Sequence, residues 1–197
     1  MTTRRVAWRR SDEIEADEHC TLAIRDGGLS LVGTVLGAEA GVPFRVEYRV
    51  LAGRDGQTSA VHVRDLRGFA TRTIALERTA KGAWTVDGAS TRELRGCTDV
   101  DLGCSPSTNT LPIRRLRLGI GSSQTIQAAW IQFPQLTVTK AAQTYTRLDE
   151  FRYRYASGTF AAELTVDEDG LVATYADWRR TGVAIGPDDT EPLDGRR

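Results

Sequence analysis

Two aspartates, Asp99 and Asp101, lie one residue apart in the most polar stretch of the chain, residues 96–116 (GCTDVDLGCSPSTNTLPIRRL). In an extended segment, residues i and i+2 point to the same side, so both carboxylates would face the same space. Such a pair can bind a metal, serve as general acid and base, or accept hydrogen bonds from arginines. A hard cation such as calcium needs more oxygen ligands than this pair supplies, so we predict no metal site.

Three arginines, Arg114, Arg115 and Arg117, follow the two aspartates. Internal ion pairs between these groups, or hydrogen bonds from the loop backbone to the aspartates, are the simplest interpretation of the stretch. General acid–base catalysis would require a cleft and a defined distance between the carboxyl groups, which sequence spacing does not provide. We therefore assign no catalytic residue and favour a protein that is not an enzyme.

Residues 105–112 (SPSTNTLP) combine two prolines with short polar side chains. Proline fixes φ, and serine, threonine and asparagine side chains can bond nearby backbone amides. The sequence therefore predicts a rigid, non-repetitive loop at the rim of the fold. Such a loop could present hydroxyl and amide groups to a sugar, or it could cap one end of the molecule.

Aromatic side chains offer another way to bind a sugar. Trp84, Trp130 and Trp178 fall in predicted strands, and their flat faces could stack on sugar rings. Tryptophans in strands are more often part of the hydrophobic core. We therefore expect these three residues in the core.

The segments that must position the polar stretch are typical of β-strands. Over residues 44–50, apolar residues alternate with charged ones, which predicts a strand with one buried and one solvent-facing side. The short connections at residues 26–28 (DGG), 80–82 (AKG) and 167–170 (DEDG) predict tight turns between antiparallel strands. About 10–12 strands are too many for a flat open sheet. The predicted fold class is all-β, with a single strongly curved antiparallel sheet that forms a half-barrel or an open barrel.

The sequence contains a weak internal repeat. Residues 72–88 resemble residues 159–178, because in both a turn is followed by a strand with an aromatic residue. This repeat predicts two similar halves of the sheet, joined through the polar stretch. Residues 1–19, where acidic residues cluster, are predicted to form a polar lead-in, and residues 181–197 a disordered tail. Residues 20–180 would then form one β domain.

The composition argues against several kinds of partner. The chain has 26 basic and 26 acidic residues, so its formal net charge of zero predicts no nucleic-acid surface. It contains no run of about 18 apolar residues that would predict an integral membrane segment, and its N-terminus lacks the apolar core of a secretory signal. With three cysteines and two histidines, we expect free thiols, a reducing cytoplasmic location, no histidine-based metal site and no cofactor.

The string DVDLGCSPSTNTLPIRRL, residues 99–116, resembles the signature of the bacterial putative glycolipid-binding family, whose members carry similar Asp-x-Asp-Leu, Ser/Thr-Pro-x-Thr-Asn and Leu-Pro-Ile-Arg-Arg-Leu elements. The resemblance extends across nearly the whole chain and includes Trp8, Tyr48 and Trp84, while Phe69 stands where a tryptophan would be expected. It implies a curved antiparallel sheet like the half-barrels of bacterial lipoprotein-localisation factors. It also implies the binding of a glycolipid.

Together these observations favour a binding module that holds the acyl part of an amphipathic ligand, a lipid or glycolipid, on the concave apolar face of the sheet. The polar head would lie near five residues of the polar stretch: Asp99, Asp101, Asn109, Arg114 and Arg115. Two alternatives stay open. One is an enzyme that acts on a lipid-linked or sugar-like substrate through Asp99 and Asp101, and the other is a structural or interaction protein without a small ligand. The oligomeric state also stays open.

Overall fold

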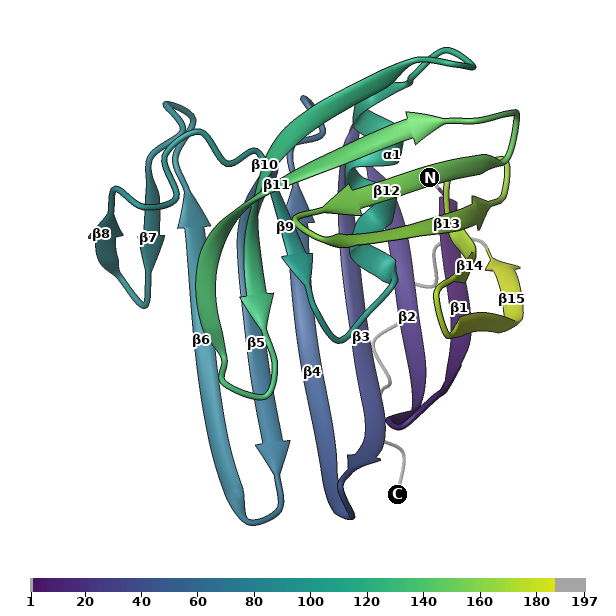
Figure 1. The fold of residues 1–197 in the computed structure, drawn as a ribbon. Helices are drawn as coiled ribbons and strands as arrows, with labels where there is room; N and C mark the ends of the chain where they lie inside the picture. Colours follow the sequence, from purple (N-terminus) through teal and green to yellow (C-terminus); the bar gives the residue numbers. More distant parts are fainter. Residues whose placement is uncertain (1, 187–197) are drawn as a thin grey trace.

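The computed structural model describes residues 2–186, which form a sheet of 15 strands and two short helical segments. The first half of the molecule comprises β1 (Thr2–Ser11), β2 (Glu15–Arg25), β3 (Gly28–Glu39), β4 (Val42–Ala52), β5 (Thr58–Arg67), β6 (Ala70–Arg78), β7 (Trp84–Val86) and β8 (Ala89–Thr91). The second half comprises β9 (Asp99–Leu102), η1 (Ser107–Asn109), α1 (Thr110–Leu116), β10 (Ser123–Gln132), β11 (Thr137–Arg147), β12 (Arg152–Ser157), β13 (Phe160–Val166), β14 (Val172–Tyr175) and β15 (Trp178–Gly186). Figure 1 shows the long strands of the first half side by side, with the second half folded across one face of them.

All the strands belong to one sheet, in which β1 to β8 form a meander and β15 to β9 continue it on the other side of β1. Strands β1 and β15 pair antiparallel, from Thr3 opposite Gly186 to Arg10 opposite Trp178. Strands β9 and β10 pair in parallel. The predicted fold class is confirmed: the chain is all-β, with one large, mostly antiparallel sheet that is not closed into a barrel. The sheet has 15 strands, more than the sequence predicted, because several strands are too short to recognise from a pattern.

The sheet curls until the first half touches the second half. The Thr58 amide donates a hydrogen bond to the Thr98 carbonyl at 2.9 Å, and the Val100 amide donates to the Thr58 hydroxyl at 3.1 Å. On the neighbouring strand β6, Arg72 donates to the carbonyl of Pro134 in the β10–β11 turn. Strands β7 and β8 extend beyond these contacts at one edge of the molecule (Figure 1).

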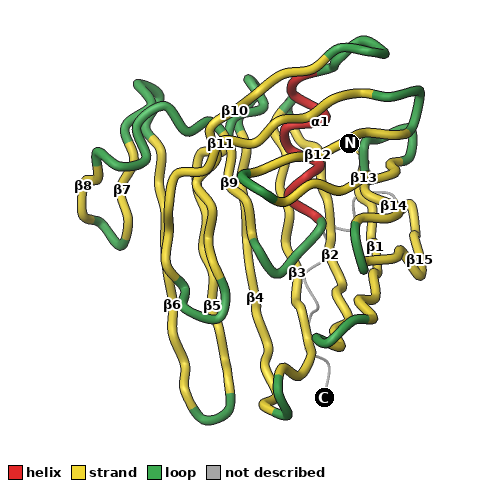
Figure 2. Tube along the Cα trace, in the orientation of Figure 1, coloured by secondary structure: helices red, strands yellow, loops and turns green. Residues whose placement is uncertain are grey.

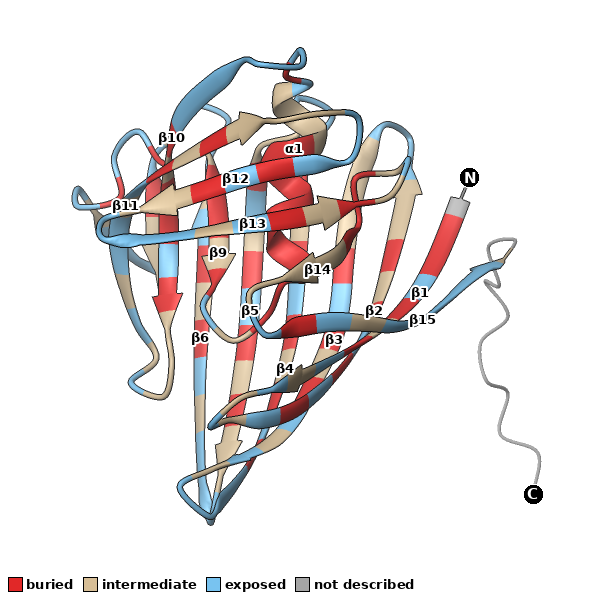
Figure 3. Cartoon of the chain, turned by 45° about the vertical axis from the view of Figure 1, so that its right-hand side comes forward, coloured by how far each residue is buried: buried red, intermediate tan, exposed pale blue. Residues whose placement is uncertain are grey.

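Helix α1 lies between the two halves, where Figure 3 shows it as a largely buried segment. A larger core combines strands of the first half with β9 and β10, and it includes Leu31, Val46, Val63, Val100 and Ile131. A smaller core packs the helix against β10 to β14, and it includes Ile113, Ile126, Tyr145, Tyr155 and Leu164. Burial of each such side chain contributes about 1.5–3 kcal/mol. The helix therefore fills the middle of the concave face on which the acyl part of a ligand was expected.

The stretch predicted as a rigid loop at the rim, residues 105–112, is buried, and residues 107–112 of it are helical, so that prediction was wrong. The 3-10 segment η1 leads directly into α1, and all three residues of η1 are buried; Figure 2 shows the helical segment in red among the strands. Pro112 is compatible with the helix because it lies in the first turn, where its missing N–H breaks no hydrogen bond. Leucine and arginine after it favour helix, and Arg117 ends α1 in the left-handed region with φ 46°.

The two ends of the chain also differ from expectation. Residues 1–19 are not a lead-in, because they contain all of β1 and the beginning of β2 at Glu15. Part of the acidic cluster belongs to a strand. Successive residues of β2 alternate between exposed and buried positions, and Glu18 occupies a buried one. At the other end, β15 continues to Gly186 because it pairs with β1, while residues 187–197 of the expected tail lie outside the described residues.

The predicted tight turns are confirmed. Strands β2 and β3 are joined through Asp26 and Gly27, with φ values of 50° and 81°, as a two-residue hairpin between twisted strands requires. The turn over residues 80–82 leads from β6 to β7, and the turn over residues 167–170 leads from β13 to β14. The turn over residues 167–170 lies next to α1, where Gly170 lies against Arg114.

Candidate functional site

A buried polar cluster anchors the central segment, residues 96–116, to the first half of the sheet. Glu18 of β2 accepts hydrogen bonds on Oε1 from the Tyr48 hydroxyl of β4 and from the Ser105 hydroxyl, the latter at 2.7 Å. The Ser107 hydroxyl lies 2.8 Å from that of Tyr48 and 2.7 Å from that of Ser105. Burying a carboxyl group without an ion pair is costly, and these hydroxyl groups offset part of that cost. The cluster therefore holds the beginning of the central segment against β2 and β4.

The carboxyl group at the centre of this cluster titrates near neutral pH. Glu18 is 2% exposed, and its Oε2 has no hydrogen-bond partner among the described residues. Burial raises the pKa of Glu18 from its ordinary value of 4.5 to about 7, although the hydrogen bonds from the three hydroxyl groups act in the opposite direction. The cluster therefore changes its protonation state within the physiological pH range.

Asp99 forms the internal ion pair that the sequence predicts. Its Oδ2 lies 2.5 Å from Nη2 of Arg115 in α1, and the Thr98 hydroxyl donates to the same oxygen at 2.7 Å. Asp99 is 1% exposed, so the pair is shielded from solvent. Removing one partner of a buried pair leaves the other charge uncompensated, which makes such pairs hard to disrupt. This ion pair links β9 to α1 and fixes the position of the helix.

Asp101 lies in a different environment, although it is on the same side of β9 as Asp99. Its Oδ2 accepts a hydrogen bond from Nε2 of Gln143 at 2.6 Å, and its Oδ1 accepts one from the Thr108 hydroxyl at 3.5 Å. Burial raises the pKa of Asp101 to about 6, and hydrogen bonds from Gln143, Thr108 and Tyr155 oppose this rise. The predicted pairing with an arginine therefore holds for Asp99 and fails for Asp101 within the described part of the chain.

Asp101 lines a pocket of about 720 Å³, the aromatic pocket, between β9 to β11 and the β12–β13 turn. Five aromatic side chains contribute to its walls: Trp130, Tyr155, Phe160, Tyr175 and Trp178. Polar side chains complete the lining: Ser105, Thr139, Lys140, Ser157 and Thr159. Trp130 and Phe160 are 37% and 47% exposed, so the pocket is open to solvent on their side. Ser105 connects the pocket to the Glu18 cluster.

The remaining predicted site residues lie elsewhere. Asn109 is buried, and its Oδ1 accepts a hydrogen bond from the Tyr145 hydroxyl at 2.8 Å. Arg114 donates to the Asp169 carbonyl, and Arg114 and Arg115 line a second cavity of about 910 Å³, the arginine cavity. Of the five predicted residues, one therefore lines the aromatic pocket, two line the arginine cavity and two are enclosed in the interior.

Most of the aromatic pocket and the buried glutamate were not recognisable from the sequence. Tyr155, Phe160 and Tyr175 come from different strands, and only the curl of the sheet brings them near Asp101. Trp130 was expected in the core but is partly exposed, whereas Trp84 and Trp178 are buried as expected. Glu18 could have been recognised by its place among the alternating buried positions of β2, but the neighbouring acidic residues masked this alternation.

Other expected features can be compared with the structure. Within residues 2–186, no group of three or more His, Cys, Asp or Glu residues is placed to hold a metal ion. No helix in this part of the chain is long and apolar enough to span a membrane. Cys20, Cys97 and Cys104 are free thiols, and the first two are buried.

Comparison with known proteins gives two matches. A family described as putative glycolipid-binding matches residues 5–180, which include the linings of both cavities. The fold is similar to the crystal structure of a DUF1089 family protein from Pseudomonas aeruginosa, with 32% sequence identity and a TM-score of 0.71. That similarity covers 85% of this chain and 91% of the other chain. Among curated proteins, no match is found.

Proposed function

Because the chain belongs to the putative glycolipid-binding family, we propose that it binds a glycolipid and holds a sugar group of that ligand in the aromatic pocket. The observation that carries this proposal is the position of Asp101, whose carboxylate lines the same pocket as five aromatic side chains. The predicted binding role of Asp101 is kept in this proposal. Arg114 and Arg115 belong to the other cavity and are not assigned to the sugar.

The pocket offers both kinds of surface that a sugar requires. The C–H faces of a sugar pack on aromatic rings, and its hydroxyl groups donate hydrogen bonds to a carboxylate. A carboxylate has about four acceptor positions, and Gln143, Thr108 and Tyr155 each take one on Asp101, so about one is left for a ligand. The pocket volume of about 720 Å³ lies within the range of about 300–1,000 Å³ that is usual for small-molecule sites.

The acyl chains of the ligand would lie at the open side of the pocket. Helix α1 fills the middle of the concave face, so the face itself is not the place for them. Trp130 and Phe160 line the pocket and are partly exposed, which gives apolar chains a surface that continues outward from the sugar. This arrangement replaces the expectation of an acyl chain along the whole concave sheet.

The geometry favours binding over catalysis by a carboxylate pair. Asp99 is buried and held by Arg115, so it has no access to a ligand in the aromatic pocket. Asp101 therefore faces the pocket without Asp99 as an acid or base partner. A single acceptor among aromatic rings suits recognition of a hydroxylated ligand.

We place the protein in the cytoplasm as part of this proposal. The supporting observation is the set of three free cysteines, since thiols persist in reducing compartments. The ligand would then be met at the inner leaflet of a membrane or as a biosynthetic intermediate.

The first test is native mass spectrometry of freshly purified protein, followed by organic extraction and lipid analysis. We expect a stoichiometric glycolipid that is lost on denaturation. Recovery of a lipid without sugar groups that is lost in Trp130→Ala would contradict the proposal, because that lipid would then occupy the aromatic pocket.

Variants at the pocket test the assignment of residues. We expect Trp130→Ala to weaken glycolipid binding about tenfold, which corresponds to about 1.4 kcal/mol, in calorimetric titration with a short-chain glucolipid. Phe69→Ala is a matched control, because Phe69 is a fully exposed aromatic residue in the β5–β6 turn and does not line the pocket. Equal loss of affinity in both variants would argue against the pocket.

A further inference from the structure

The arginine cavity is a separate site at the C-terminal end of α1. Its walls come from α1, from the β2–β3, β4–β5 and β13–β14 turns, and from residues near Arg147 and Tyr153. It shares no lining residue with the aromatic pocket, which lies next to the residues that precede η1. A ligand in one cavity would therefore leave the other free.

Five arginines line this cavity: Arg54, Arg114, Arg115, Arg117 and Arg147. Arg115 is neutralised by Asp99. Arg54 and Arg117 are exposed, and neither has a carboxylate partner among residues 2–186. The guanidinium group of Arg147 donates to three backbone carbonyl groups at 2.9–3.0 Å and so carries a charge that no carboxylate pairs with in the described structure.

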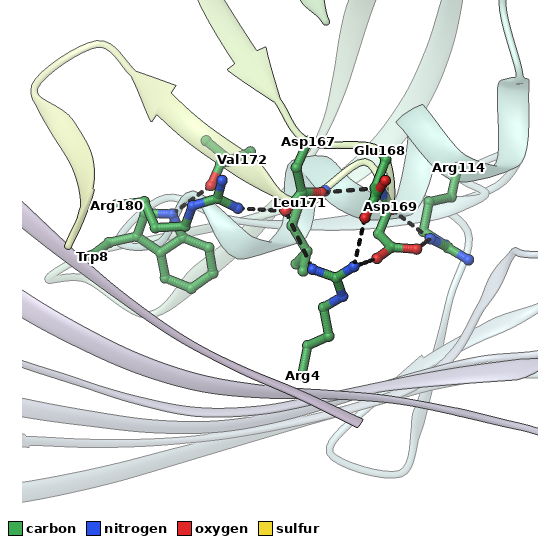
Figure 4. Close-up of polar contacts among 9 residues, drawn as sticks. All are labelled: Arg4, Trp8, Arg114, Asp167, Glu168, Asp169, Leu171, Val172 and Arg180. Atoms are coloured by element: carbon green, nitrogen blue, oxygen red, sulfur yellow. Dashed lines mark hydrogen bonds and ion pairs between the residues drawn. The ribbon is translucent and has the colours of Figure 1, made fainter. Parts of the chain in front are cut away.

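The acidic residues of the β13–β14 turn, which form one wall of the cavity, are paired with arginines outside its lining. Asp167, Glu168 and Asp169 form the β13–β14 turn, and all three carboxylates face the side chain of Arg4, which is 9% exposed. Arg180 pairs with Asp167 at 2.5 Å. Figure 4 shows Arg4 and Arg180 reaching the acidic turn, with Arg114 next to Asp169. The three carboxylates are therefore engaged and compensate little of the charge of the other cavity arginines.

Positive charge is in excess on the remaining walls. The other acids of the lining are Asp55, whose Oδ1 accepts a hydrogen bond from the Gln57 amide, and Glu150. These two acids compare with three guanidinium groups, those of Arg54, Arg117 and Arg147, that have no carboxylate partner within residues 2–186. Burial lowers the pKa of Arg114, and the charge of Arg117 lowers it further, which indicates repulsion between these neighbouring cations. An anion bound here would relieve that repulsion.

We propose that the arginine cavity binds the phosphate group of a ligand. A guanidinium group donates two parallel N–H bonds, and this geometry matches the oxygens of a phosphate. In the described part of the chain, the guanidinium groups of Arg54 and Arg117 have no hydrogen-bond acceptor, and they come from different elements, the β4–β5 turn and the end of α1. The apolar part of the lining, which includes Ile24, Leu29, Ile113 and Val166, accommodates the tail of a phosphate-bearing lipid. The same arginines also suit a free phosphate, so the two sources share one chemistry.

Calorimetric titration of the full chain tests this site with two probes, inorganic phosphate and dioctanoyl phosphatidic acid below its micellar concentration. We expect saturable binding of at least one probe, weakened about tenfold or more in the double variant Arg54→Gln/Arg117→Gln. The matched control is Arg92→Gln/Arg95→Gln, which removes two exposed arginines after β8 that line neither cavity. The control should bind both probes like the wild type.

The outcomes separate the sources and the two sites. Binding of the lipid at least about tenfold tighter than inorganic phosphate assigns the site to a phospholipid, and equal affinities assign it to free phosphate. The proposal is overturned if neither probe binds saturably, or if Arg54→Gln/Arg117→Gln binds as tightly as the wild type. Trp130→Ala should leave phosphate binding unchanged, so failure of the glycolipid proposal would be distinguishable from failure of this one.

Discussion

The aromatic pocket and the arginine cavity both adjoin the central segment, residues 96–116, but aromatic side chains dominate the first and charged side chains the second. The aromatic pocket takes rings from strands of the second half, with Asp101 as its acceptor. The arginine cavity takes its charged groups mainly from turns and from the C-terminal end of α1. Asp101 and Arg115 are close in sequence, yet α1 places them in different cavities. Neighbouring residues of one motif can therefore line two separate cavities when one of them lies on a strand and the other on a helix.

The largest effect should follow from breaking the buried ion pair between Asp99 and Arg115, a residue that lines the arginine cavity. Asp99→Ala leaves Arg115 without its buried partner, so we expect a loss of about 3–5 kcal/mol in unfolding free energy. The double variant Asp99→Ala/Arg115→Ala should lose less, because it leaves no uncompensated charge. Thermal and denaturant unfolding would measure both. Asp17→Ala, at an exposed ion pair with Arg9, should change stability little, and an equal loss there would contradict this account.

A smaller effect is expected at the Glu18 cluster, which adjoins the aromatic pocket alone. The folded-state pKa of about 7 exceeds the ordinary value of 4.5. Between these values the folded state retains a proton that the unfolded state releases, so stability is fully present below pH 4.5 and falls as pH rises to about 7. The fall should amount to roughly 3 kcal/mol.

The variant Glu18→Gln keeps a hydrogen-bond acceptor and removes the titration. Its unfolding free energy should therefore lack this decline when denaturant melts are compared between pH 4.5 and pH 7.5. Parallel pH profiles of the variant and the wild type would rule out Glu18 as the titrating group.

A substitution in one cavity should affect only the ligand of that cavity. Trp130→Ala should weaken the glycolipid about tenfold and leave phosphate binding unchanged, whereas Arg54→Gln/Arg117→Gln should do the reverse. Calorimetric titration of each variant with each ligand gives four values. A loss of both ligands in either variant would show that the cavities form one site.

The smallest effect concerns the pH dependence of sugar binding. Asp101 accepts hydrogen bonds best when ionised, and its pKa is raised to about 6. Glycolipid affinity should therefore fall a few-fold as pH drops below about 6. In Asp101→Asn this dependence should disappear, and binding at pH 7.5 should be weaker. A wild-type affinity that is constant from pH 5 to pH 8 would exclude the carboxylate from recognition.

Local patterns were sufficient to predict the parts of the fold that depend on neighbouring residues. Alternation over residues 44–50 and the Asp26–Gly27 turn reflect backbone geometry within a few residues, and both are found in the structure. The Asp99–Arg115 pair was predictable because complementary charges follow each other closely. Helix α1 was missed because two prolines and several polar residues argue for a loop, while burial between the halves supplies the stability that its local sequence lacks.

The candidate sites were harder to predict because their members are distant in sequence. Tyr155 and Tyr175 meet with ring centroids 5.8 Å apart near Asp101, but no spacing in the chain relates the three residues. Glu18 joins Ser105 across 87 positions. Such contacts follow from the order of the strands and the curl of the sheet, and these are determined by the packing of the whole chain.

The pairing of β1 with β15 has a consequence for the synthesis of the protein. Strand β1 leaves the ribosome before the other strands of the sheet and can pair with β2 soon afterwards, but its other edge stays open until residues 178–186 emerge. The centre of the sheet is therefore completed last, by the contact with the greatest separation along the chain. A nascent chain that stops before Trp178 would expose the unpaired edge of β1, which is a template for aggregation and for binding by chaperones.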